Sequence, residues 1–119
     1  MNEGQIKTQQ LRDEIRDVFP TPVPVDSLVF LMTELGEVAD VVTRFGYGGL
    51  VRYLRGTVID ERDLRQRLVM ELGDTYMMLC TLATSVGVDL DVALESTIQK
   101  LQKRAEAARG AYLKEGVVC

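Results

Sequence analysis

Two short stretches of the chain, MTELGEV at residues 32–38 and VMELGDT at residues 69–75, carry the same pattern of residue types. The aligned positions are Glu34 with Glu71, Leu35 with Leu72, Gly36 with Gly73, and Glu37 with Asp74. Apolar residues recur every three or four positions before and after each acidic pair, which is the period of an amphipathic helix. The sequence therefore predicts two helices that present equivalent acidic pairs.

Four predicted helices account for most of the 119 residues. The first covers about residues 2–18, and prolines at positions 20, 22 and 24 prevent it from continuing. The second runs from an N-cap at Asp26 to about residue 45. The other predicted boundaries are a third helix capped by Asp60 or Asp63 and ended by Gly87, and a fourth capped by Asp89 or Asp91, reaching about Ala108 and ended by Gly110.

The first predicted helix has only a loose apolar stripe, formed by Ile6, Leu11, Ile15 and Val18. A chain of this kind is expected to bury further surface against a copy of itself. No strand pattern and no second domain are apparent. The predicted class is an all-α, four-helix bundle-like domain over residues 1–119, assembled as a homodimer or homotetramer.

The composition excludes several classes of function. A net charge of −4 argues against nucleic acid as a partner, because such binding needs a positive surface. The absence of histidine excludes Ser-His-Asp catalysis and histidine-containing zinc sites. No apolar run approaches the roughly 20 residues of a membrane span, and the first residues do not resemble a signal peptide. We therefore expect a cytoplasmic protein in which Cys80 is a reduced core residue and Cys119 a free thiol.

The acidic pairs border the apolar sides of their helices. The predicted apolar stripes are Leu31, Leu35, Val38, Val42 and Phe45 in the second helix, and Leu64, Leu68, Leu72, Thr75, Leu79, Leu82 and Val86 in the third. At 100° per residue, Glu34 lies about 60° and Glu37 about 120° from the stripe centre. Glu71 and Asp74 take the same angles. Packing of the two stripes would bring four carboxylates together.

An ordinary solvated helix face is the competing interpretation of these acids. Two features disfavour it. No basic residue stands four positions after any of the acids, so none is placed to form a pair along its helix. Gly36 and Gly73 also interrupt the helices, at a cost of about 1 kcal/mol each relative to alanine. The hypothesis is that each glycine makes room for ions or phosphates.

Four clustered carboxylates repel one another and need a cation or bound protons. Ligands that are all oxygen favour a hard ion, Mg²⁺ first and Mn²⁺ second. Because Mg²⁺ completes its shell with water and substrate phosphates, the sequence predicts a magnesium site for a phosphate compound. The expected nucleophile is a water activated by a metal that Glu34, Glu37, Glu71 and Asp74 hold.

Basic residues of the fourth helix are candidates for phosphate binding. Arg104 lies about 70° from the centre of that helix's apolar stripe, and Lys100 lies further out on the same side. The competing interpretation is that they only favour the helix dipole. In the connection over residues 46–59, Arg52 and Arg55 are candidates for closing over phosphates or for contacting another subunit.

The stretches FLMTELGEVADVV and MELGDTYMMLCTLATSVGVDLDVALE resemble the two motifs of the MazG-like all-α nucleoside triphosphate pyrophosphohydrolases, and the resemblance covers about residues 26–104. It implies hydrolysis of NTPs or dNTPs between the α and β phosphates, giving a monophosphate and pyrophosphate, by a dimer or larger assembly. It also implies that Glu34, Glu37, Glu71 and Asp74 are the magnesium ligands.

The chain departs from the family pattern at three positions. Thr33 stands where the family commonly has a first glutamate, and Ser96 and Ile98 stand where it often has lysine and asparagine. The stretch between the motifs is also longer than usual. Two alternatives stay open: a phosphoribosyl-ATP pyrophosphohydrolase, whose motif is similar, and a catalytically silent helical oligomer that binds a nucleotide or metal.

Overall fold

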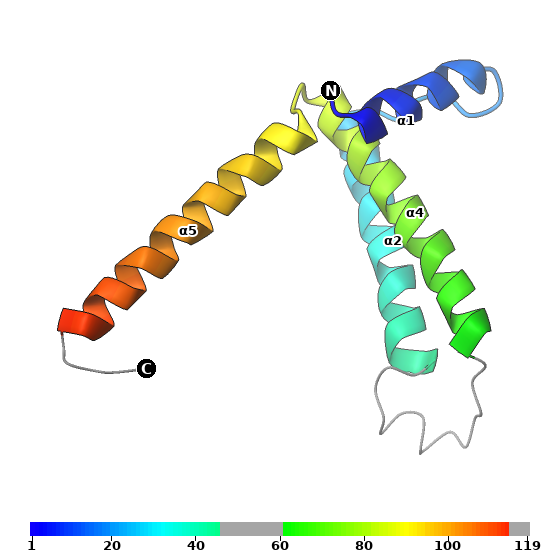
Figure 1. The fold of residues 1–119 in the computed structure, drawn as a ribbon. Coiled ribbons are helices and arrows are strands. Elements are labelled where there is room, and N and C mark those ends of the chain that lie inside the picture. The colour runs from blue at the N-terminus through cyan, green and yellow to red at the C-terminus, as the bar shows by residue number, and fades with distance from the viewer. Residues whose placement is uncertain (46–60, 115–119) are drawn as a thin grey trace.

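The computed structural model describes residues 1–45 and 61–114 of the chain (Figure 1). The described elements are the helices α1 (Glu3–Glu14), α2 (Pro24–Phe45), α4 (Glu61–Ser85) and α5 (Leu90–Lys114). No strand occurs in these ranges, so the predicted all-α class is confirmed. The predictions for Arg52 and Arg55 lie outside the described residues.

The first two helices differ from their predicted boundaries. α1 ends at Glu14 rather than near residue 18. At its start, the Asn2 side chain accepts a hydrogen bond from the Gln5 backbone N–H, and the Gln5 side chain accepts one from the Asn2 backbone N–H. α2 begins at Pro24, so Asp26 lies in its first turn and the predicted N-cap is wrong. The reason is that proline has no N–H to leave unsatisfied at the first helical position.

The turn between α4 and α5 is formed by the residues that the sequence predicted. Gly87 takes a positive φ of 74°, and Val88 N–H donates to the Ala83 carbonyl at 2.9 Å, which is the usual glycine ending of a helix. Asp89 caps α5, because its Oδ1 accepts from the backbone N–H of Asp91 at 2.8 Å.

Two other predicted boundaries are not found. Gly110 does not end α5, which runs on to Lys114. A single helical glycine costs only about 1 kcal/mol, and the Ala-Tyr-Leu-Lys sequence after it favours helix. Asp63 lies inside α4 and caps nothing, while Asp60 lies outside the described residues.

The helices α2 and α4 run antiparallel and pack along their length (Figure 1). The less exposed residues on their facing sides, here named the α2–α4 seam, are Ser27, Leu31, Glu34, Val38 and Val41 of α2 and Leu64, Leu68, Glu71, Thr75 and Met78 of α4. Each member of the second group follows its counterpart by 37 positions, the offset between Glu34 and Glu71. The repeat in the sequence is therefore also a repeat in burial.

The helix α1 packs on α4 through polar side chains. Gln5 and Thr8 are its buried residues, and Arg12 Nε donates to Thr81 Oγ1 at 3.3 Å. The predicted apolar stripe does not pack on α4, because Ile6 and Leu11 are exposed in the single chain, and its expected contact with another copy stays a prediction. The surface that α4 offers to α1 carries hydroxyl groups, which polar partners satisfy and apolar ones do not.

The helix α5 does not pack along the other helices. The chain turns by 97° between α4 and α5, and α5 projects away from the α2–α4 pair (Figure 1). The radius of gyration is 19.8 Å, whereas a compact domain of this length has about 13.5 Å. A single chain therefore does not form the closed four-helix bundle that the sequence suggested, and the apolar side of α5 stays exposed.

Within residues 1–45 and 61–114, no single helix has the length and apolar character of a membrane span. The sharply bent pair α4–α5 meets the criterion only when its two helices are taken together, by length and composition.

Candidate metal centre

Three acids from α2 and α4 meet at the α2–α4 seam. One carboxylate oxygen from each of Glu34, Glu71 and Asp74 lies within 4.8 Å of the other two. Glu34 and Glu71 are half-buried and Asp74 is exposed. The fourth predicted ligand, Glu37, is exposed and is not part of this group, but it lies close enough for its charge to raise the pKa of Glu34 and of Glu71. All four acids therefore lie in one neighbourhood.

The structure rotates the acids further inward than the sequence predicted. Glu34 and Glu71 lie in the seam itself, while Leu35 and Leu72 are turned out of it, with 50% and 53% of their surface exposed. The predicted stripes were therefore wrong at these two leucines. The apolar side of each helix is too wide for one neighbouring helix to cover. The two helices pack through the edge of that side that lies next to the acids.

The electrostatics of the cluster oppose full ionisation. Burial raises the pKa of Glu34 first, and the nearby charges of Glu37, Asp74 and Glu71 raise it further. The pKa of Glu71 is also raised, chiefly by its hydrogen bond with Glu37, then by burial and by the charges of Glu37 and Asp74. Too little positive charge surrounds these carboxylates to offset the free-energy cost of ionising all of them.

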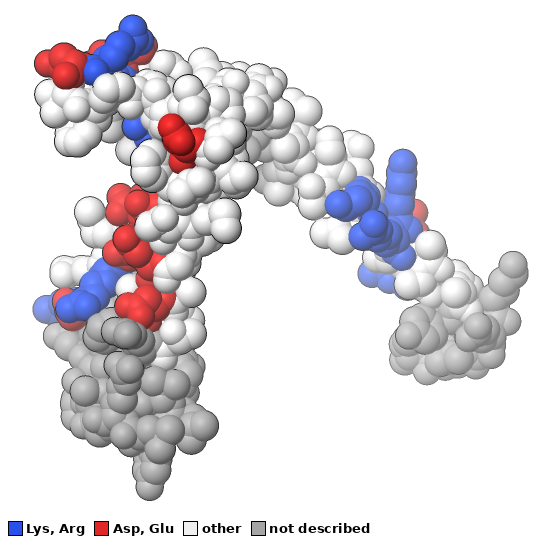
Figure 2. Space-filling view, turned by 180° about the vertical axis from the view of Figure 1, so that it is seen from behind, with Lys and Arg blue, Asp and Glu red and all other residues white. Residues whose placement is uncertain are grey.

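Two oxygens of the cluster have no hydrogen-bond partner in the described part of the chain. Glu34 Oε2 and Glu71 Oε2 are buried and accept no hydrogen bond. Among the described residues no ion pair neutralises either glutamate. Figure 2 shows the acidic side chains of the α2–α4 pair gathered in one column. Oxygen-only donors, two of them buried and unpaired, fit a hard divalent cation such as Mg²⁺.

The predicted phosphate-binding residues lie elsewhere. Lys100 and Arg104 are exposed on α5, whose basic side chains gather towards its far end, away from the acidic column (Figure 2). Within the described residues neither forms an ion pair. The single chain therefore brings the acidic residues together but does not bring these basic residues to them.

The two glycines of the repeat do not face the acids. Within residues 1–45 and 61–114, nothing lies within 4 Å of a Cβ built at Gly36 or Gly73. At 100° per residue, each glycine points about 160° away from the glutamate two positions before it. The helix geometry therefore does not favour the hypothesis that they make room for ions or phosphates at this site, and that hypothesis stays an untested prediction.

We expect Gly36→Ala and Gly73→Ala each to stabilise the fold. Each Cβ would enter open space, and alanine is the better helix former by about 1 kcal/mol. Urea unfolding of each variant would show a higher midpoint than the wild type, with unchanged Mg²⁺ affinity. A loss of stability in either variant would mean that another molecule approaches the backbone there.

An antiparallel helix pair with an oxygen-only acidic cluster defines an all-helical protein with a candidate site for a divalent cation. The chain belongs to the MazG nucleotide pyrophosphohydrolase domain family, whose model matches residues 26–108. That range contains α4, nearly all of α2 and most of α5, and all four acids of the cluster. Neither the curated proteins nor the solved structures compared with this chain gave a significant match.

Proposed function

We propose that the protein is a magnesium-dependent pyrophosphohydrolase that cleaves NTPs or dNTPs to the monophosphate and pyrophosphate. The observation that carries the proposal is the acidic cluster within the segment that matches the family. Its unpaired buried oxygens are explained by a cation, and phosphates complete the coordination of Mg²⁺ in many proteins.

The roles of the acids follow from their placement. Glu34 and Glu71 would direct their unpaired oxygens at the cation, and Asp74 would complete the protein's share of ligands from the exposed side. Glu37, also exposed, would hold a second ion or orient water beside Glu71, whose pKa it raises. A bound Mg²⁺ supplies charge neutralisation for the phosphates and an activated water.

A second copy of the chain would supply the positive charge. Lys100 and Arg104 lie on α5, which does not pack along the helices that carry the acids, and the triphosphate that binds there needs cations beyond the metal. In an assembly, α5 of one copy would bring these residues to the acidic cluster of another. The proposed site is therefore shared between copies, as a homodimer or homotetramer.

An exposed apolar surface supports this assembly. The two helices are antiparallel and the seam repeats at an offset of 37 positions, so a local twofold axis relates α2 to α4. Under that axis Leu35 and Leu72 come to one side of the pair, and Glu37 and Asp74 come to the other. The apolar side, formed by Leu28, Met32 and Leu35 of α2 and Leu72 and Leu79 of α4, is exposed. Such a surface is typical of an interface between subunits.

The proposed function predicts pyrophosphate release from a nucleotide. Purified protein with millimolar Mg²⁺ would be offered the common NTPs and dNTPs and phosphoribosyl-ATP, with pyrophosphate and monophosphate as the products measured. Pyrophosphate from one class of substrate supports the proposal. Release of inorganic phosphate alone, or release that does not depend on a divalent ion, would overturn it.

A silent binding protein is the second candidate, and Thr33 favours it. Its hydroxyl donates to the Val29 carbonyl of its own helix at 3.1 Å, so it is already engaged with the backbone. The position where the family commonly carries another acid therefore contributes no carboxylate. Nucleotide binding by calorimetry without turnover on any substrate would identify this case.

We expect the stabilisation of the fold by Mg²⁺ to grow as the pH rises. The pKa values of Glu34 and Glu71 are raised above about 4.5, so without metal the folded state holds their protons more tightly than the unfolded state. That contribution to stability is fully present below about pH 4.5 and is lost as the pH rises through the raised pKa values. Since Mg²⁺ competes with those protons, its increase in Tm should be larger at pH 8 than at pH 5. An equal increase at both pH values would contradict the assignment.

A further inference from the structure

The side chain of Gln5 is buried and fully bonded. None of its surface is exposed. Its Nε2 donates to the Val88 carbonyl at 2.8 Å and to Thr84 Oγ1 at 3.2 Å. Its Oε1 accepts from the backbone N–H of Leu90 at 2.9 Å and of Asn2 at 3.0 Å. An amide side chain has two donors and two lone pairs, so every one of them is used. These four hydrogen bonds are here named the Gln5 clamp.

The Gln5 clamp joins three parts of the chain at the point where α5 begins. Thr84 belongs to the last turn of α4, Val88 to the connecting turn, and Leu90 is the first residue of α5. Without Gln5, the Val88 carbonyl and the Leu90 N–H would need other partners, because helix starts leave their first N–H groups unsatisfied. α1 thus supplies the hydrogen bonds that complete the α4–α5 turn.

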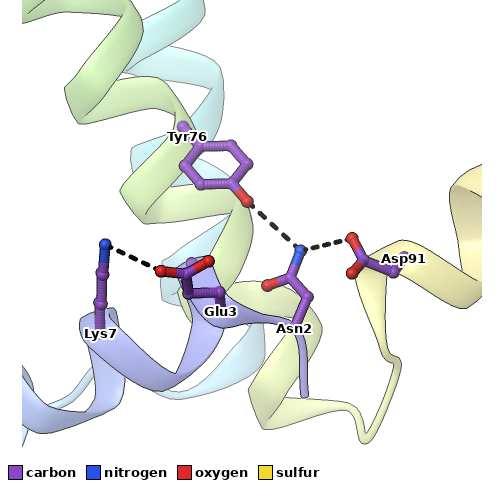
Figure 3. Close-up of a pocket in the computed structure, with 6 residues that line it drawn as sticks. Asn2, Glu3, Lys7, Tyr76 and Asp91 are labelled. Carbon is purple, nitrogen blue, oxygen red and sulfur yellow. Dashed lines mark hydrogen bonds and ion pairs between the residues drawn. The ribbon is translucent and has the colours of Figure 1, made fainter.

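Neighbouring residues hold α1 close enough for this. Asn2 Nδ2 donates to Tyr76 Oη at 3.3 Å and to Asp91 Oδ1 at 3.2 Å, so it links α4 to the first turn of α5 (Figure 3). A Cβ built at Gly4 would lie 2.4 Å from Tyr76 Oη. The tyrosine ring is therefore seated against a position that only glycine can occupy without movement.

We propose that Gln5 is a positioning residue, which fixes the direction in which α5 leaves α4. The helix has no extensive packing along its length, and the turn before it contains a glycine. From Leu90 to Arg104 the helix extends about 21 Å. A change of about 10° at its base would therefore displace Arg104 by on the order of 4 Å, far more than phosphate binding tolerates.

The consequence for substrate rests on the proposed function, in which Lys100 and Arg104 bind phosphates in another copy. In that case Gln5 would touch no substrate and would act only through α5. Loss of the clamp would raise KM for the nucleotide more than it lowers kcat, because the basic residues would spend less time in place while the acidic cluster stayed intact.

The test measures the direction of α5 directly. In a Cys119→Ser background, spin labels are placed at two exposed positions, by Arg65→Cys in α4 and Gln102→Cys in α5. Cys80 is buried and does not compete for label. Dilution with unlabelled chains restricts the measured distances to one chain. Gln5→Met keeps the length of the side chain and removes all four hydrogen bonds, and Gln10→Met is the matched control on the exposed side of α1.

We expect one narrow distance peak for the wild type and for Gln10→Met, and loss of that peak to a broad distribution for Gln5→Met. A narrow, unshifted peak in Gln5→Met would overturn the proposal. If Gln5→Met does not fold, Thr84→Val, which removes one bond of the clamp at constant shape, takes its place: broadening supports the proposal and an unchanged peak overturns it. Broadening in a protein whose wild type releases no pyrophosphate would uphold the clamp and reject the proposed function.

Discussion

Replacement of Glu71 by glutamine is expected to abolish the rise in Tm with Mg²⁺ and to lower turnover about 100-fold or more. Mutation of a residue that only supports a metal ligand already lowers metal affinity or activity about 10- to 100-fold, and Glu71 is proposed as a ligand itself. Glu71 holds one of the two buried oxygens that lack a partner. Glutamine keeps the size of the side chain but removes its charge. The measurements are the shift in Tm with millimolar Mg²⁺ and the rate of pyrophosphate release.

The same variant should unfold no more easily than the wild type when metal is absent. The pKa of Glu71 is raised by its neighbours, so its charge opposes folding at neutral pH and the amide relieves that repulsion. Glu106→Gln makes the same change in net charge at an exposed position of α5 and is the control. A Glu71→Gln protein that still gains Tm with Mg²⁺ like the wild type would remove Glu71 from the ligands.

Most of the fold's elements could be predicted from local patterns. Apolar spacing marked α2, α4 and α5 clearly and α1 only loosely. Gly87 and Asp89 marked the turn between α4 and α5, because a positive φ and a helix cap depend on residues in the turn itself. Helix ends were predicted less well. The helix α2 begins at Pro24, earlier than the cap predicted at Asp26. The helix α5 does not end at Gly110, since one unfavourable residue is outweighed by its helical neighbours.

Packing between helices was predicted less well than the helices themselves. The sequence shows that α2 has a wide apolar arc but not which part of it faces α4, so Leu35 was expected inside and lies outside. Gln5 gave no signal at all. Its partners Thr84 and Leu90 are 79 and 85 positions away, and a polar residue in an exposed-looking helix is not recognisable as a buried one.

The acidic cluster was predictable because its geometry repeats in the sequence. Glu34, Glu71 and Asp74 meet across the α2–α4 seam as the aligned stretches suggested. Lys100 and Arg104 were expected to lie near these acids, which requires a closed four-helix bundle. In the single chain α5 points away from the α2–α4 pair, so it does not bring these residues to the acids. Because the position of α5 leaves apolar surface exposed in the single chain, the oligomeric state is the next quantity to measure.

We expect Leu72→Asp to dissociate the proposed assembly into single chains. Leu72 is half exposed on the apolar side of the α2–α4 pair, so a carboxylate there is tolerated by the monomer. In an interface it would be buried without a partner, at a cost of several kcal/mol, enough to dissociate a dimer at micromolar concentration. Light scattering gives the mass, and circular dichroism checks that the helices persist.

Gln66→Asp is the matched control, since it adds a carboxylate at an exposed polar position of the same helix and should leave the mass unchanged. The proposed shared site adds a second consequence. Because Lys100 and Arg104 would reach the acids of another copy, the single-chain form of Leu72→Asp should lose nucleotide turnover while keeping its Tm response to Mg²⁺. A monomeric wild type, or a monomeric variant with full turnover, would show that one chain suffices and that the charge for the phosphates comes from elsewhere.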